Sequence, residues 1–239
     1  MSIIVPAVLP SSRADLEKNL ALIARIPSVS RVQIDVVDGR FASPASWPYT
    51  VTEEFRDMIK HGEMLPYLDR ISYEIDLMCV DAERVAEAWL ALGATRLPFH
   101  AERPPALGRL LSSARKRYGA GDGFAPGLVS FGVALNLASD LSLIEQNLGE
   151  IEYVQFMGIA RIGRQGQPFD HRVLEKIRVF RGRHPEIPMQ VDGGVSLDTA
   201  RRLIALGISN LVVGSALLRA PDPAATFALF EALRSPYGV

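Results

Sequence analysis

The 239-residue chain is 48% hydrophobic and 22% charged, which is ordinary for a folded globular protein and excludes an intrinsically disordered chain. Its formal net charge of −1 provides no bulk field that would attract nucleic acid or an anionic membrane. Cys79 is the single cysteine and cannot form an internal disulfide. No apolar stretch is long enough to span a bilayer, and the first residues lack the pattern of a signal peptide. We therefore expect a cytoplasmic protein with neither a nucleic-acid nor a membrane partner.

Short apolar runs alternate with longer segments of helical period along the chain, which is the pattern of repeated βα units. Eight strands are predicted, at residues 3–9, 31–36, 71–78, 95–99, 129–136, 153–157, 189–192 and 210–214. Eight helices are predicted near residues 12–25, 52–60, 82–92, 105–118, 141–148, 171–183, 197–206 and 223–233. Most of the strands are continuously apolar, as in a parallel sheet covered on both faces. The sequence therefore predicts an α/β fold in which residues 1–239 form a single (β/α)8 TIM barrel domain.

An aspartate lies at the end of the second and of the seventh predicted strand. Because active sites of such barrels lie at the carboxyl ends of the strands, Asp35 and Asp192 are expected to face each other across the barrel mouth. Proton transfer at a carbon next to a carbonyl needs a carboxylate on each face of that carbon, and burial can raise one pKa so that this carboxyl starts protonated. The pair is a candidate acid and base for epimerisation. Alternatively, each aspartate caps the helix that follows it.

The turns after the seventh and eighth predicted strands are rich in glycine. They contain Gly193 and Gly194, and Gly214 with Ser215. Glycine lets the backbone approach a ligand, so that amide N–H groups can face an anion, and barrels of this class commonly hold phosphate at these two turns. We therefore expect a phosphate monoester here. The alternative is that both are only tight strand-to-helix turns.

Oxygen-bearing side chains are predicted to converge at the same mouth. They are Gln33, Asp35, Asp76 and Asp192. An oxygen-only set suits a hard cation such as Mg²⁺ or Mn²⁺, whereas zinc in proteins favours histidine and cysteine. The sequence is equally consistent with a metal-free hydrogen-bonded network.

Two long loops and one histidine add candidates for substrate contact. Loops as long as residues 40–51 and 158–169 tend to be functional, and the second carries Arg161 and Arg164. These arginines could clamp an anionic group as a lid closes, although solvated loop arginines are common. His100 follows the fourth predicted strand, where it either meets substrate or is a structural histidine.

Several short motifs occur in the order found in one known family. They are residues 32–41 (VQIDVVDGRF), 75–78 (IDLM), 99–102 (FHAE), 132–136 (GVALN), 166–169 (GQPF), 191–195 (VDGGV) and 214–216 (GSA). As an ordered set they are specific, and they extend over nearly the whole chain. In these motifs the sequence resembles the ribulose-phosphate 3-epimerases, as a divergent member.

The resemblance implies a ribulose-phosphate-binding barrel and an isomerase of carbohydrate metabolism. Such enzymes interconvert D-ribulose 5-phosphate and D-xylulose 5-phosphate through an enediolate, with two aspartates and a divalent metal. The two aspartates fall at Asp35 and Asp192. The resemblance also implies phosphate contacts at the glycine turns, a lid that closes near Gly166, and methionines that line the site at Met78 and Met157.

The sequence also departs from the pattern of that family. The family binds its metal with two histidines and two aspartates, and the two histidine positions fall at Gln33 and Asp76. A substrate-contacting serine is replaced by Pro10, and the lid sequence differs at residues 159–166.

Three hypotheses follow from the sequence. The first is a pentose-phosphate epimerase, and the second is an enzyme of the same kind acting on a more anionic phosphosugar, as Arg161 and Arg164 suggest. The third is a catalytically silent barrel that binds a phosphorylated metabolite or a partner protein. In each case the expected ligand is a small phosphorylated sugar or metabolite, and apolar faces on the outer helices are compatible with a homo-oligomer.

Overall fold

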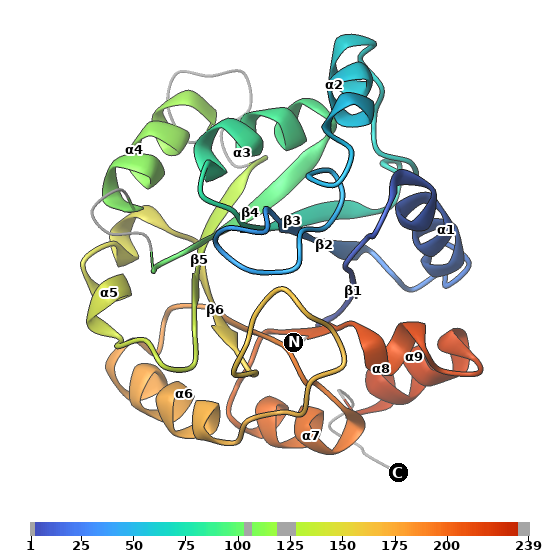
Figure 1. Ribbon diagram of the computed structural model, residues 1–239. Helices are drawn as coiled ribbons and strands as arrows, with labels where there is room; N and C mark the ends of the chain where they lie inside the picture. Colours follow the sequence, from blue (N-terminus) through green and yellow to red (C-terminus); the bar gives the residue numbers. More distant parts are fainter. Residues whose placement is uncertain (1–2, 103–106, 119–127, 234–239) are drawn as a thin grey trace.

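The computed structural model describes residues 3–102, 107–118 and 128–233, and these form a closed parallel barrel (Figure 1). Each strand pairs with the next in the chain, and β8 pairs with β1 to close the sheet. The strands are β1 (Ile3–Val8), β2 (Arg31–Val37), β3 (Ser72–Met78), β4 (Ala94–His100), β5 (Ser130–Leu135), β6 (Tyr153–Met157), β7 (Met189–Asp192) and β8 (Asn210–Val213). The predicted (β/α)8 barrel is confirmed.

Helices surround the barrel, as Figure 1 shows. They are α1 (Arg13–Ile23), α2 (Thr52–Lys60), α3 (Ala82–Ala91), α4 (Leu107–Tyr118), α5 (Ser142–Glu145), the 3-10 helix η1 (Leu148–Glu150), α6 (Arg172–Arg183), α7 (Leu197–Ala205), α8 (Ser215–Leu218) and α9 (Pro223–Ala232). None of the helices in these ranges is both long and apolar enough to cross a membrane.

Two helical segments differ from the prediction. The helix expected over residues 141–148 is one α-helical turn followed by η1, because Asn147 and Gly149 are weak helix formers. The four-residue α8 was not predicted, since one turn is too short to show a hydrophobic period. The first two residues of the helix expected over 105–118 lie outside the described residues.

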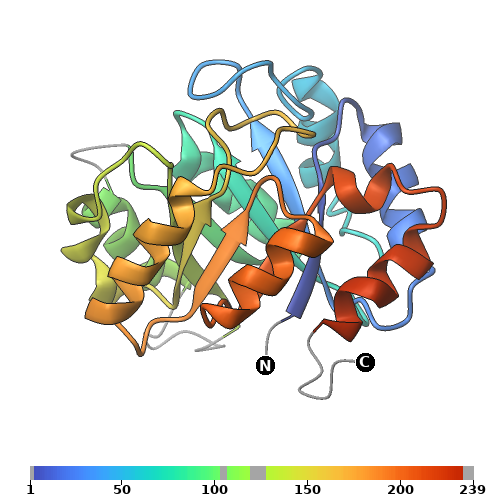
Figure 2. The same cartoon turned by 90° about the horizontal axis from the view of Figure 1, so that it is seen from below.

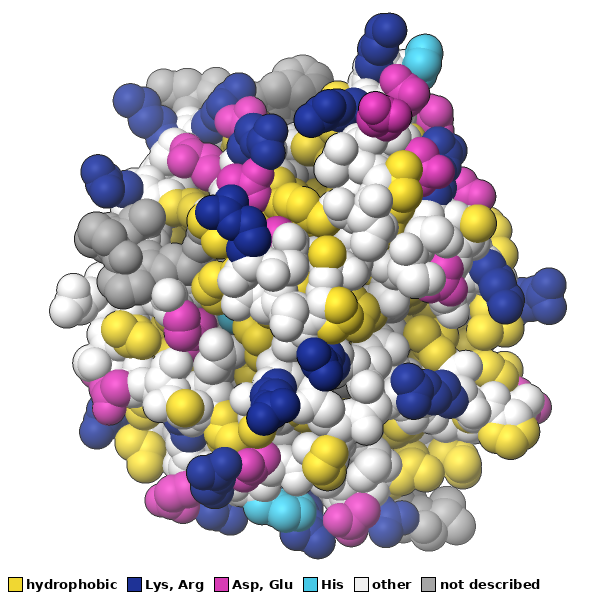
Figure 3. Space-filling view, in the orientation of Figure 1, with side chains coloured by type: hydrophobic (Ala, Val, Ile, Leu, Met, Phe, Trp, Pro, Cys, Tyr) yellow, Lys and Arg dark blue, Asp and Glu magenta, His cyan; other side chains and the backbone are white. Residues whose placement is uncertain are grey.

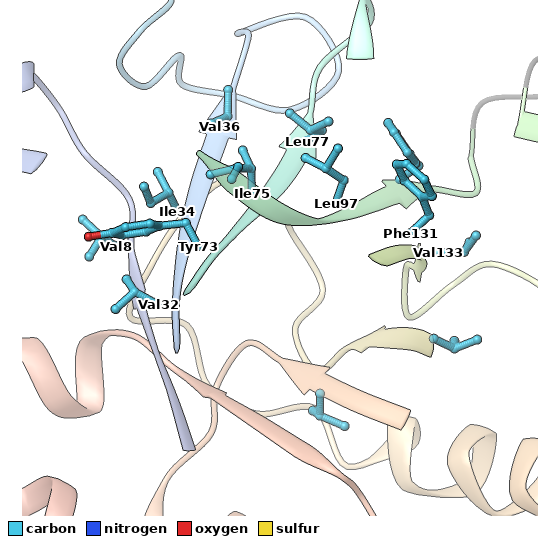
Figure 4. Close-up of a cluster of buried hydrophobic side chains, with 14 of the residues drawn as sticks. Val8, Val32, Ile34, Val36, Tyr73, Ile75, Leu77, Leu97, Phe131 and Val133 are labelled. Atoms are coloured by element: carbon cyan, nitrogen blue, oxygen red, sulfur yellow. The ribbon is translucent and has the colours of Figure 1, made fainter. Parts of the chain in front are cut away.

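Most strands place apolar side chains on the outside of the barrel and polar ones inside, whereas β1 and β8 contribute the small apolar cluster Val5, Ala7 and Val212. In β2, Val32 and Ile34 belong to the buried apolar cluster that packs against the helices, and Figure 4 shows them beside Tyr73 and Ile75 of β3. The residues between them point the opposite way, because side chains alternate along a strand. The parallel register sets Asp35 beside Asp76. Neighbouring strands therefore contribute their polar residues to the same interior.

The interior of the barrel is a hydrogen-bonded polar core. Its fully buried members are Gln33, Glu74, Asp76, His100, Gln155 and Gln190. At the end nearer the amino termini of the strands, Glu74 pairs with Nε of Arg96 at 2.8 Å. Buried polar groups are costly unless they have hydrogen-bond partners, and here amide and carboxylate groups supply one another.

The two long loops meet over the carboxyl ends of the strands. Figure 2 shows both on the same side of the barrel, opposite the start of β1. Nε of Arg164 donates a hydrogen bond to the carbonyl oxygen of Ser43 at 3.0 Å, which links the second loop to the first. A Cβ atom added at Gly163 would lie 3.0 Å from Cβ of Ala42, so the loop backbones approach closely there. The loops therefore form one cover over the barrel mouth.

Packing inside the barrel predicts a large cost for one added methyl group. At Gly132 in β5, an added Cβ would lie 2.6 Å from Cε2 of Tyr153, a buried ring on which Cζ of Arg96 stacks at 3.9 Å from the centroid. Gly132→Ala should therefore lower the free energy of unfolding by about 1–3 kcal/mol in a urea titration. Gly149→Ala is the matched control, since nothing lies within 4 Å of its added Cβ. Equal stability of the two variants would contradict this account of the interior.

Candidate functional site

A cavity of about 340 Å³ opens at the barrel mouth, and most of the predicted site residues line it. Those that do are Asp35, Met78, Met157, Arg164, Gly166, Asp192, Gly193, Gly194, Gly214 and Ser215. Because they come from β2, β3, β6, β7 and β8 and from the loops after them, closure of the barrel is what brings them together.

Three carboxyl groups meet at this cavity, and two of them, those of Asp35 and Asp192, line it. Oxygen atoms of Asp35, Asp76 and Asp192 lie within 4.8 Å of one another, close enough that together they could hold a metal ion. Nε2 of Gln33 donates to Oδ1 of Asp35 at 2.9 Å and to Oδ2 of Asp192 at 3.3 Å. The amide group of Gln33 therefore bridges the two aspartates that the sequence pointed to as acid and base.

The pKa values of these two aspartates are raised. Burial, followed by the charges of Asp192 and Asp76, holds the pKa of Asp35 well above its ordinary value. Burial and the charge of Asp76 raise the pKa of Asp192 to about 7, although the hydrogen bond from Gln33 opposes this shift. At neutral pH Asp192 is therefore close to its midpoint.

Asp76 is engaged on both oxygens. Nε2 of His100 lies 3.0 Å from Oδ1, and Nε2 of Gln155 donates to Oδ2 at 2.9 Å. Burial alone would lower the pKa of His100, but the carboxylates of Asp76 and Glu102 outweigh it and raise this pKa to about 9. At neutral pH the imidazole of His100 is therefore protonated.

His100 itself is fully buried, and the ring of Phe41 from the first long loop lies 5.3 Å from its own. His100 is not among the described residues that line the cavity. The structure therefore places His100 behind Asp76, where it contacts a carboxylate of the site.

The two glycine turns lie side by side at one end of the cavity. Gly193 and Gly194 have φ of +99° and +68°, a region that favours glycine. A Cβ atom at Gly194 would also lie 2.6 Å from the backbone of Phe169, so a side chain has no room there. From the lid loop, Nε2 of Gln165 reaches across to Gly214 and donates to the carbonyl oxygen of Ala7 at 3.1 Å. Both turns thus line the cavity with residues that have little or no side chain.

The arginines of the second loop differ in position. Arg164 lines the cavity, whereas Arg161 is absent from its described lining and instead borders a neighbouring surface pocket. Arg219, just after α8, lines the cavity as well, and its Nη1 lies 3.0 Å from the position of a Cβ at Gly166. Arg219 was not among the predicted site residues, because the four-residue helix before it is too short to show a hydrophobic period. On the face drawn in Figure 3, basic side chains lie near the centre, while acidic side chains gather toward the edge.

Solved structures of other proteins share this fold. A 3-hexulose-6-phosphate synthase from Salmonella typhimurium superposes with a TM-score of 0.68 at 13% identity, covering 97% of this chain and 98% of its own. A 3-keto-L-gulonate-6-phosphate decarboxylase from Vibrio cholerae gives a TM-score of 0.65 at 13% identity, covering 98% of this chain and 97% of its own. At such low identity the likeness establishes the barrel fold alone.

Curated relatives are closer in sequence. The ribulose-phosphate 3-epimerase of Bacillus subtilis is 29% identical over 196 residues, which is 80% of this chain and 81% of the relative. The Escherichia coli K12 enzyme of the same name is 26% identical over 224 residues, with coverage of 92% and 90%. The model of the ribulose-phosphate 3 epimerase family matches residues 3–218. Since this match extends from β1 to the end of α8, the protein belongs to the ribulose-phosphate 3-epimerase family.

Proposed function

We propose that the protein is a sugar-phosphate epimerase that interconverts D-ribulose 5-phosphate and D-xylulose 5-phosphate. The observation that carries the proposal is the pair Asp35 and Asp192, two buried carboxyls with raised pKa values on one cavity wall. Epimerisation needs a base to remove the proton from C3 and an acid to return one on the opposite face. Two neighbouring carboxyls, one ionised and one protonated, would supply both groups.

In the proposed reaction, the ionised aspartate takes the C3 proton, and the electron pair of the C–H bond moves into an enediolate. The protonated aspartate then delivers its proton to the other face of C3. In this scheme Asp192 is the base in one direction, and Asp35 is the base in the reverse direction. Negative charge passes from a carboxylate to a substrate oxygen and back, so the total charge of the site does not change.

The proposed substrate binds by its phosphate at the two glycine turns. Backbone N–H groups at Gly193, Gly194 and Gly214 are suited to an anion, because these residues line the cavity and have no side chain of their own. Ser215 adds a hydroxyl and Arg219 a cation at the same end of the cavity. The lid residues Gln165 and Gly166 lie over this end and would exclude water when a ligand is bound.

A second candidate substrate is a sugar phosphate with another anionic group. The observation that favours it is the presence of both Arg164 and Arg219 on the cavity wall, since a single phosphate needs only one of them. The two aspartates and the reaction would be the same. The two candidate functions differ only in which ligand binds more tightly.

Solvent isotope exchange tests the proposed chemistry. In D2O, the protein should incorporate deuterium at C3 of ribulose 5-phosphate, which mass spectrometry can follow. Asp35→Asn and Asp192→Asn should each slow this exchange by about 10²–10⁴-fold, because each variant lacks one proton-transfer group. Neither variant should be less stable at pH 8, because an acid whose pKa is raised by folding lowers stability at that pH and an amide does not. Asp198→Asn, at an exposed position, is the control. A protein that binds the phosphosugar without exchange would be a silent binding barrel.

The pH dependence of turnover should be bell-shaped. Below about pH 7 Asp192 is protonated and cannot act as the base, so kcat/KM should rise with pH through this region. At high pH both carboxyls ionise and no acid remains, so kcat/KM should fall again. Initial rates measured between about pH 5 and about pH 10 would show this. A profile that stays level across the whole range would contradict a reaction that depends on this pair.

The two loop arginines form a matched pair for testing ligand contact. Arg164→Ala should raise KM by about three- to tenfold, because Arg164 lines the cavity but is exposed and therefore screened. Arg161→Ala should leave KM unchanged, since Arg161 borders a different pocket. Arg219→Ala should behave like Arg164→Ala.

Inhibition by anions distinguishes the two candidate substrates. If inorganic phosphate inhibits the Arg164→Ala protein as strongly as the wild type, but sugar bisphosphates bind the variant more weakly than the wild type, the more anionic substrate is favoured.

A further inference from the structure

We propose that the amide group of Gln33 takes the place of a divalent cation between Asp35 and Asp192, so that this site operates without a bound metal. The proposal deepens the function proposed above and rests on it for its chemical meaning. The contents of the site can nevertheless be tested separately from turnover.

The first observation is the direction in which Gln33 points. Its NH2 group can donate two hydrogen bonds, and its nitrogen lies 2.9 Å from Oδ1 of Asp35 and 3.3 Å from Oδ2 of Asp192. A cation needs a lone pair from each of its ligands, and a side-chain amide can offer one only through its oxygen. Gln33 instead presents hydrogen-bond donors to the two carboxylates. The position that a bridging cation would share with these oxygens is therefore filled by a neutral donor.

The second observation is that the surrounding network fixes this orientation. Nε2 of Gln190 donates to Oε1 of Gln33 at 3.2 Å, to Oε1 of Gln155 at 2.7 Å, and to a carboxylate oxygen of Glu74. If Gln33 were flipped, its oxygen would face two carboxylates and its NH2 group would face the NH2 group of Gln190. Flipping Gln190 as well would turn its oxygen toward Glu74. The orientation of Gln33 is thus set by an acid deeper in the barrel.

The third observation is that both carboxylate oxygens of Asp76 already accept a hydrogen bond. Oδ1 lies 3.0 Å from Nε2 of His100, and Oδ2 lies 2.9 Å from Nε2 of Gln155. A cation at Asp76 would have to share these oxygens with two buried hydrogen-bond donors. Of the four predicted oxygen ligands, Gln33 therefore presents its NH2 group to the site, and Asp76 is already hydrogen-bonded at each oxygen. The remaining oxygens of Asp35 and Asp192 are those that the proposed proton transfer uses.

Gln33 is in this view a positioning residue. It holds two carboxyls that repel each other at close distance, and because it is neutral it does so without drawing both of them into the ionised form. The neutral bridge therefore matches a reaction in which one of the two must keep its proton.

Metal binding to the intact protein tests the proposal directly. After dialysis against EDTA, we expect Mn²⁺ titrations followed by electron paramagnetic resonance to show no saturable site tighter than about 1 mM. Deuterium exchange, where it occurs, should be unchanged by EDTA. A single Mn²⁺ site with micromolar affinity in the wild-type protein would overturn the proposal, as would exchange that occurs only after Mn²⁺ is added.

Gln33→Glu should create the site that the wild type lacks. The variant replaces the NH2 group by a carboxylate oxygen, and we expect its affinity for Mn²⁺ to rise by at least about tenfold. Gln167→Glu is the matched control, because Gln167 lines the same cavity but its amide contacts backbone carbonyls of the lid. An equal gain in both variants would mean that charge alone attracts the ion and would contradict the special position of Gln33.

The outcomes separate this inference from the proposed function. A wild-type protein without a metal site and without isotope exchange would refute the epimerase and leave the account of Gln33 intact. Exchange that requires Mn²⁺ would refute the account of Gln33 and support the epimerase. If Gln33→Glu does not fold, the wild-type titration still decides the question.

Discussion

The site depends on how three buried carboxylates are held together. Asp35, Asp76 and Asp192 approach within 4.8 Å, at a depth where repulsion is poorly screened. The three carboxyl groups differ in the contacts that offset this repulsion. Asp76 has His100 and Gln155 as partners, whereas Asp35 and Asp192 share the amide of Gln33 and have raised pKa values. The imidazole of His100 therefore offsets the charge of Asp76, whereas the pKa values of Asp35 and Asp192, which line the cavity, stay raised.

This arrangement distinguishes Asp76 from the two aspartates that line the cavity. Hydrogen bonds connect the amide of Gln33, through the amide of Gln190, to the carboxylate of Glu74 deeper in the barrel. The contact between Gln190 and Glu74 therefore influences which atom of the Gln33 amide faces the two aspartates. Retaining crowded, partly protonated acids in a cavity costs stability, and proteins usually do so where chemistry is performed. The surrounding apolar cluster and the closed sheet supply the rigidity that holds the acids in place.

Membership of the epimerase family and the details of this site bear on different questions. The family match and the curated relatives concern the whole chain, from the first strand to the helix after the last. The identity of the ligand depends on a few side chains at the cavity wall, among them Arg164 and Arg219, which come from a loop and a short helix. Loops of a barrel can change while its strands keep their register, because the rigid sheet does not depend on them.

The sequence by itself determined the barrel, its strand order and the strand-end aspartates, because apolar runs, helical periods and glycine turns are local features. It also pointed to the cavity glycines and to Arg164. It did not reveal Arg219, the position of His100 behind Asp76, or the direction of the Gln33 amide. These depend on contacts between strands far apart in the chain. Hydrogen-bond direction in particular is set jointly by all neighbours of a group, so only the closed barrel could decide whether Gln33 offers an oxygen or a proton.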